Sequence, residues 1–142
     1  MNTMKLEFLS RSENERFARM VAAAFVLELD PTMEQLSEIK TAVSEAVTNA
    51  IIHGYDGGEG TVILEGVLED HAVQFSVTDY GKGIDDIEKA REPLYSGKPE
   101  MERSGMGFTI MESFMDKVVV ESEPGKGTMV TMVKAVEAED ER

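Results

Sequence analysis

Four short segments of this chain carry residue types that suit the binding of a nucleotide. Glu45 and Asn49 stand four residues apart, and the glycine-rich segments 79–83, 105–107 and 125–128 follow in that order. A carboxylate can accept a hydrogen bond from the amino group of adenine, and an amide oxygen can ligate Mg²⁺. Glycine leaves the backbone open to a phosphate because it has no Cβ. The ordered set predicts an ATP site.

Glu45 and Asn49 are expected on a helix. Residues four apart project from the same helix face, and the neighbours Val43, Val47 and Ala50 are apolar. A carboxylate and an amide beside a buried stripe can build a metal and general-base site. An ordinary solvated helix face is the alternative that this spacing leaves open.

The glycine-rich segments are predicted to surround the nucleotide. Asp79 ends an expected strand and can accept a hydrogen bond from a base, with Gly81 and Gly83 admitting the ring. Residues 104–107 precede an expected helix, whose first amides bind phosphate readily. Thr128 would reach the base. The alternatives are a plain β-turn at Asp79, a glycine-hinged loop at 104–107 and a hairpin turn before Thr128.

Periodicity and turn residues predict helices early in the chain and strands late. Thr32 and Gln35 fit a capping box at the start of the second helix. Residues 91–104 contain Pro93, Gly97 and Pro99 and predict a loop. The expected helices cover residues 12–29, 32–54 and 107–114, and the expected strands cover residues 5–9, 61–68, 72–79, 117–122 and 128–136. This order favours an α+β two-layer sandwich, with helices on one face of a mostly antiparallel sheet.

The first of these helices is expected to bury one apolar stripe. The stripe follows the helical period and consists of Phe17, Met20, Val21, Ala24, Phe25 and Leu29.

Composition excludes several classes of function. The formal net charge of −14 over 142 residues opposes binding to nucleic acid or to an anionic membrane surface. The chain has no cysteine, two histidines and no apolar run of about 20 residues. We expect a cytoplasmic protein with a basic partner or with ligands that carry Mg²⁺. Residues 1–136 are expected to form one domain, and the acidic residues 137–142 a disordered tail.

Other nucleotide motifs are absent from the sequence. The segment 125–128 lacks the upstream glycine of a G-x-x-x-x-G-K-[ST] loop, and no G-x-G-x-x-G follows an early strand.

The four segments together resemble the GHKL ATPase/kinase superfamily, whose members share the Bergerat ATP-binding fold. The resemblance covers about residues 5–134, and segments 30–55 and 98–112 are similar to the serine kinases that act as sporulation anti-sigma factors. It implies a two-layer α/β sandwich with a mixed, mostly antiparallel sheet. One departure is Ser96–Gly97, where two threonines would be expected before Lys98.

The resemblance also implies roles for particular residues. Asn49 would coordinate Mg²⁺, and Asp79 would bind adenine. Glu45 would be the base for an incoming serine hydroxyl, and Arg103 would neutralise the γ-phosphate. The implied ATP-contacting residues are Asn49, Asp79, Gly81, Gly83, Ile84, Lys98, Ser104, Gly105, Met106, Gly107 and Thr128.

Two protein partners are implied for such a kinase. It would sequester a sporulation sigma factor of the F type and phosphorylate an anti-anti-sigma protein, acting as a homodimer. Residues 11–20 carry a local charge of +1 in a strongly acidic chain, which suggests Arg16 and Arg19 as partner contacts.

Other functions remain open as alternatives. A nucleotide-gated binding protein without catalysis would explain the same motifs apart from Glu45. A histidine-kinase catalytic domain or a gyrase-like or chaperone-like ATPase is disfavoured, because we find no acceptor helix or transducer segment in the sequence.

Overall fold

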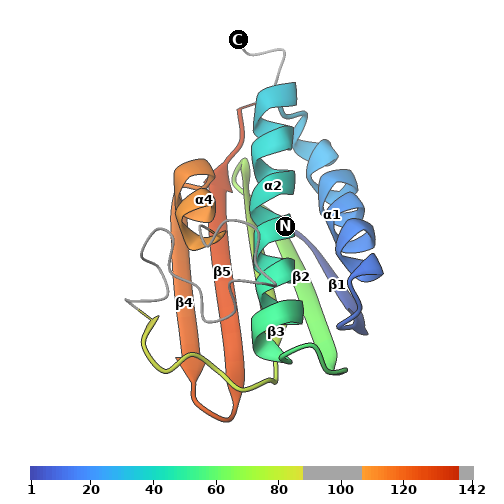
Figure 1. Ribbon diagram of the computed structural model, residues 1–142. Helices are drawn as coiled ribbons and strands as arrows, with labels where there is room; N and C mark the ends of the chain where they lie inside the picture. The colour runs from blue at the N-terminus through green and yellow to red at the C-terminus, as the bar shows by residue number, and fades with distance from the viewer. Residues whose placement is uncertain (88–106, 138–142) are drawn as a thin grey trace.

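The computed structural model describes residues 1–87 and 107–137 and consists of helices packed on one face of a five-stranded sheet (Figure 1). The strands are β1 (Asn2–Leu9), β2 (Thr61–Glu69), β3 (Ala72–Asp79), β4 (Lys117–Glu123) and β5 (Gly127–Ala135). The helices are α1 (Glu13–Val26), α2 (Met33–Asn49) and α4 (Gly107–Phe114). The α+β two-layer fold is therefore confirmed.

The sheet has the strand order β1-β2-β3-β5-β4, and each neighbouring pair is antiparallel. In the β3–β5 pair Asp79 lies opposite Thr128, so the end of β3 and the start of β5 meet at one end of the sheet. Two residues expected to share a site, 49 positions apart in sequence, are thus brought together by the register.

Helix α2 begins at the predicted capping box. The hydroxyl of Thr32 accepts from the backbone N–H of Gln35 at 2.9 Å, and the Gln35 side chain accepts from the Thr32 N–H at 3.2 Å. The α-helix ends at Asn49, and the residues to the expected end at Gly54 form a π-helical turn, Ala50–Gly54. Such turns are rare and concentrate at functional sites.

The core lies between the helices and the sheet. Phe25 of α1 meets Phe75 of β3 edge to face, with ring centroids 6.1 Å apart. Each large apolar side chain buried here stabilises the fold by about 1.5–3 kcal/mol. The largest fully buried side chains are Phe75, Ile39, Leu64, Met111, Met132, Val26, Val43, Val47, Val62 and Val73.

The predicted apolar stripe of α1 is wrong at three positions. Phe17 and Met20 are 53% and 56% exposed, and Ala24 is exposed too. The buried face of α1 consists of Ala18, Ala22, Ala23 and Val26. Small side chains on this face allow α1 to pack closely against α2, and the larger apolar side chains on the other side are left in solvent.

Two expectations fall on residues outside the described ranges: the loop over 91–104 and the acidic tail beyond residue 137. Within the described ranges, no helix has the length and hydropathy that crossing a membrane requires.

The variant Thr32→Ala tests the capping box. It removes the acceptor for the Gln35 N–H, so the free energy of unfolding is expected to fall by about 1 kcal/mol. Equilibrium denaturation in urea measures the change. The control Thr32→Ser keeps the hydroxyl and should stay close to wild type. An unchanged free energy in the alanine variant would show that the cap does not contribute.

Candidate nucleotide site

Three segments that are distant in sequence meet at one end of the sheet, the lower end in Figure 1. They are the π-helical turn after α2, the segment that follows β3, and the turn between β4 and β5. The backbone N–H of Lys82 donates to the carbonyl oxygen of Gly54 at 2.8 Å, and the N–H of Gly125 donates to the carbonyl of Lys82 at 2.6 Å. These bonds fix the three segments relative to one another.

Asp79 is the buried acid of this site. The residue is 5% exposed, and its carboxylate accepts from the backbone N–H of Gly81 at 2.9 Å. Burial raises the pKa of Asp79 above its ordinary 3.8, while hydrogen bonds from the backbone of Gly81 and Thr128 oppose that rise. A carboxylate has about four acceptor positions, so Asp79 can accept a further hydrogen bond from a ligand.

Glycines make the position of Asp79 possible. A Cβ on Gly54 would lie 2.6 Å from the Asp79 Cγ, and one on Gly127 would overlap the Asp79 carbonyl oxygen. A Cβ on Gly81 would overlap the Gly54 carbonyl oxygen. Gly81 was predicted as a site residue; the roles of Gly54 and Gly127 depend on contacts between distant segments and were missed.

Ser122 connects the predicted residues Ile84 and Thr128. Its hydroxyl accepts from the backbone N–H of Ile84 at 2.7 Å and lies 2.8 Å from the Thr128 hydroxyl oxygen. Gly83 has a φ of +78°, and a Cβ there would overlap the carbonyl oxygen of Glu123. Ser122 was not predicted, although a serine that follows Val118 and Val120 on the core-facing side of β4 is a usable signal.

Glu45, Asn49 and Gly107 form the second part of the site. Both side chains are half-buried on α2, and α4 begins at Gly107. A Cβ on Gly107 would lie 3.2 Å from Asn49 Nδ2 and 3.4 Å from Glu45 Oε2. The N-terminal end of α4 therefore lies directly against the predicted amide and carboxylate, as a phosphate site at a helix start requires.

The possible metal ligands of this part of the site suit a Mg²⁺ ion that is bound mainly by phosphate and water. Within the described ranges, no group of three or more His, Cys, Asp or Glu side chains is arranged to hold a metal ion. Mg²⁺ in nucleotide sites usually takes one or two protein oxygens, with substrate phosphates and waters completing the octahedron. The amide oxygen of Asn49 beside the glycine at the start of α4 fits that pattern.

Seven predicted residues remain. Lys98, Arg103, Ser104, Gly105 and Met106 fall outside the described residues. Arg16 and Arg19 are on α1, where Arg16 is exposed and Arg19 Nε lies 3.4 Å from Glu15 Oε2.

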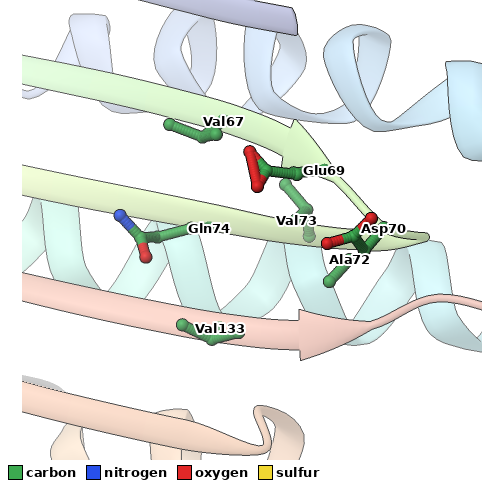
Figure 2. Close-up of a pocket in the computed structure, with 7 residues that line it drawn as sticks. All are labelled: Val67, Glu69, Asp70, Ala72, Val73, Gln74 and Val133. Carbon is green, nitrogen blue, oxygen red and sulfur yellow. The ribbon is translucent and has the colours of Figure 1, made fainter. Parts of the chain in front are cut away.

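A hollow at the other end of β3 contains none of the predicted residues. Figure 2 shows Val67, Gln74 and Val133 projecting from β2, β3 and β5 on the face of the sheet away from the helices. Glu69 and Asp70 are the carboxylates of its rim. It lacks the glycine-lined, buried acid of the Asp79 end, so we place the candidate site at Asp79.

The variant Asp79→Asn tests the burial of this charge. Because the folded-state pKa is raised, the folded protein holds the proton more tightly than the unfolded chain does. Wild-type stability therefore falls as pH rises from about 3.8 to the folded-state pKa. Asparagine carries no such charge. The Asp79→Asn variant should therefore become more stable relative to the wild type as pH rises through that window.

Urea denaturation at a series of pH values measures this difference. The control Glu121→Gln removes one negative charge from an exposed position on β4, and it reports the effect of net charge alone. A difference for Asp79→Asn that does not vary with pH, or that shifts in favour of aspartate, would contradict the raised pKa.

Comparisons with known proteins show the family to which this chain belongs. Residues 8–134 match the family described as histidine kinase-like ATPase domain. The chain is 62% identical over 135 residues to the anti-sigma F factor of Geobacillus stearothermophilus, covering 94% of this chain and 92% of the relative. It is 59% identical over 133 residues to the anti-sigma F factor of Clostridium acetobutylicum, covering 94% and 93%.

The fold also matches a solved structure. The crystal structure of the RsbU and RsbW domains of a Mycobacterium tuberculosis protein aligns with a TM-score of 0.70 at 20% identity, covering 97% of this chain and 34% of that one. The family match and the identities to the two anti-sigma F factors show that the chain belongs to the histidine kinase-like ATPase domains and, among them, to the family of anti-sigma F factors.

Proposed function

We propose that this chain is a cytoplasmic anti-sigma factor and an ATP-dependent protein serine kinase. It binds and inhibits a sporulation sigma factor of the F type and phosphorylates a serine of the anti-anti-sigma protein. Two relatives, at 59% and 62% identity, are named anti-sigma F factor, and the matched family is a kinase-like ATPase domain. The observation that carries the nucleotide-binding part is the buried carboxylate of Asp79 among glycines.

Adenine is assigned to the Asp79 end of the site. The carboxylate already accepts from the Gly81 N–H and keeps capacity for the 6-amino group of the base. Gly83 and Ile84 follow directly along the chain, and Thr128 lies opposite Asp79 in the sheet. A purine with an oxygen in place of the 6-amino group would set two acceptors against each other, so the site favours ATP over GTP.

The phosphates are assigned to the space between α2 and the start of α4. Asn49 would ligate Mg²⁺, which when bound supplies charge neutralisation for phosphoryl transfer. The start of α4 at Gly107 lies against Asn49, and Ser104, Gly105 and Met106 immediately precede it. We assign those three residues to the phosphates, and Lys98 and Arg103 to the γ-phosphate, on the strength of the family match.

Glu45 is assigned as the general base. Its carboxylate is on the same helix face as Asn49, and both lie against Gly107. A base at this point can accept the proton of a serine hydroxyl as the hydroxyl approaches the γ-phosphate. Phosphoryl transfer depends mainly on positioning and charge neutralisation, so a single base beside the metal ligand is sufficient.

The outer side of α1 is assigned to protein partners. It displays Phe17 and Met20 at 53% and 56% exposure, and the turn that follows α1 displays Leu27 at 57%. Arg16 is exposed on the same helix, and Glu15 orients Arg19 by an ion pair. Exposed apolar side chains flanked by arginines are typical of protein interfaces. The protein is proposed to act as a homodimer.

The alternative is a nucleotide-gated binding protein without catalysis. The presence of Glu45 beside Asn49 favours the kinase, because binding alone does not need a base. Incubation with ATP labelled at the γ-phosphate and with the anti-anti-sigma protein separates the two. Label on a partner serine supports the kinase, and complete absence of label supports the binding protein.

The variant Glu45→Gln tests the assigned base in the same assay. The rate of label transfer should fall by about 10²- to 10⁴-fold, while the affinity for Mg·ATP should remain. The control Glu34→Gln changes an exposed carboxylate in the first turn of the same helix and should transfer at the wild-type rate. A fully active Glu45→Gln variant would exclude Glu45 as the base.

The variant Asn49→Ala tests the assigned metal ligand. It removes the amide oxygen that would hold Mg²⁺ against the phosphates, so binding of Mg·ATP in calorimetry should be lost. Addition of EDTA to the wild-type protein should produce the same loss by removing the metal instead of the ligand. Unchanged affinity in the alanine variant would contradict the assignment.

A further inference from the structure

Tyr55 makes two hydrogen bonds with one hydroxyl group. The hydroxyl donates to the carbonyl oxygen of Thr61 at 2.5 Å and accepts from the backbone N–H of Tyr80 at 2.7 Å. Burial raises the pKa of Tyr55 above its ordinary 10.0, and the charge of Asp79 adds to that rise. The hydroxyl therefore keeps its proton, and with it the donor for Thr61, at physiological pH.

These bonds join three parts of the fold. Tyr55 directly follows the π-helical turn that ends at Gly54, Thr61 begins β2, and Tyr80 directly follows Asp79. On the other side of Gly81, the Lys82 N–H donates to the Gly54 carbonyl. Two consecutive residues, 54 and 55, thus hold the backbone on both sides of the glycine that donates to Asp79.

The ring of Tyr55 is itself seated on a glycine. A Cβ on Gly60 would overlap the ring, with 2.6 Å to the Cδ1 atom. Gly60 does not have a positive φ, so its backbone tolerates a side chain and only the space is missing. Packing against Gly60 and two hydrogen bonds at the hydroxyl group leave the ring one position.

We propose that Tyr55 is a positioning residue for base selection: its hydroxyl sets where Asp79 stands relative to α2, and so how well the site discriminates the 6-amino group of a purine. This inference rests on the proposed function, because it assumes that Asp79 binds adenine. Hydrogen-bond strength depends steeply on angle and distance, so a displaced carboxylate loses its preference for the amino group. Asn49 lies on the helix that leads into Tyr55. Tyr55 therefore also fixes the position of Asp79, at the base end, relative to Asn49, at the phosphate end.

The test compares two nucleotides on the wild type and on Tyr55→Phe. The probes are Mg·ATP and Mg·purine-riboside triphosphate, which lacks only the 6-amino group, and calorimetry gives both dissociation constants. The wild type should bind ATP the more tightly. In Tyr55→Phe that preference should shrink by about tenfold, while affinity for purine-riboside triphosphate changes little. A purely structural role for Tyr55 would lower both affinities together and leave their ratio unchanged.

A matched control is Tyr80→Phe. It removes a phenol hydroxyl from the neighbouring position, where the side chain is 61% exposed, and leaves the backbone N–H in place. Its ratio of the two affinities should equal that of the wild type. A lowered ratio in this control as well would overturn the proposal.

The variant Gly60→Ala displaces the ring without changing the hydroxyl, and it decides the matter if Tyr55→Phe fails to fold. It should lower the ratio as Tyr55→Phe does, and it should have no further effect in a Tyr55→Ala background, where the space is free. Failure of the wild-type protein to bind ATP would contradict the proposed function itself. A wild type that prefers ATP, with unchanged ratios in Tyr55→Phe and Gly60→Ala, would overturn this inference alone.

Discussion

Asp79 holds a carboxylate at a position where 5% of the residue is exposed. Burial of an ionised group costs free energy unless hydrogen bonds replace the lost water. The backbone of Gly81 and of Thr128 replaces part of it. A carboxylate offers about four acceptor positions, so Asp79 keeps acceptor capacity that a base with an amino group can use. In the proposed function, this local cost in stability is the source of selective binding.

The segments around Asp79 are shaped by the space that this carboxylate needs. The π-helical turn after α2 brings Gly54 to within contact of Asp79, and Gly54 has no side chain to obstruct it. The close approach of Gly127 to the Asp79 backbone is possible for the same reason. Earlier in the same helical run, Asn49 and Glu45 meet Gly107. One helical run thus sets the distance between the proposed base end and the proposed phosphate end of the site.

Much of the fold could be predicted because its signals are local. The strand segments of β2 and β3, the Thr32–Gln35 cap and the glycines after Asp79 are all short-range patterns, and the structure has each of them. Contacts between distant segments could not be predicted. The Tyr55 hydroxyl contacts the Tyr80 backbone only because α2 and β3 end at the same end of the sheet. The stripe of α1 was mistaken because that helix has two apolar sides, and only packing against α2 decides which side is buried.

The proposed function depends on adenine meeting the carboxylate of Asp79, and a crystal structure with Mg²⁺ and a non-hydrolysable ATP analogue tests this most directly. We expect the 6-amino nitrogen within hydrogen-bonding distance of the Asp79 carboxylate, and the phosphates between Asn49 and the start of α4. A nucleotide bound at another surface, or a base turned away from Asp79, would contradict the account.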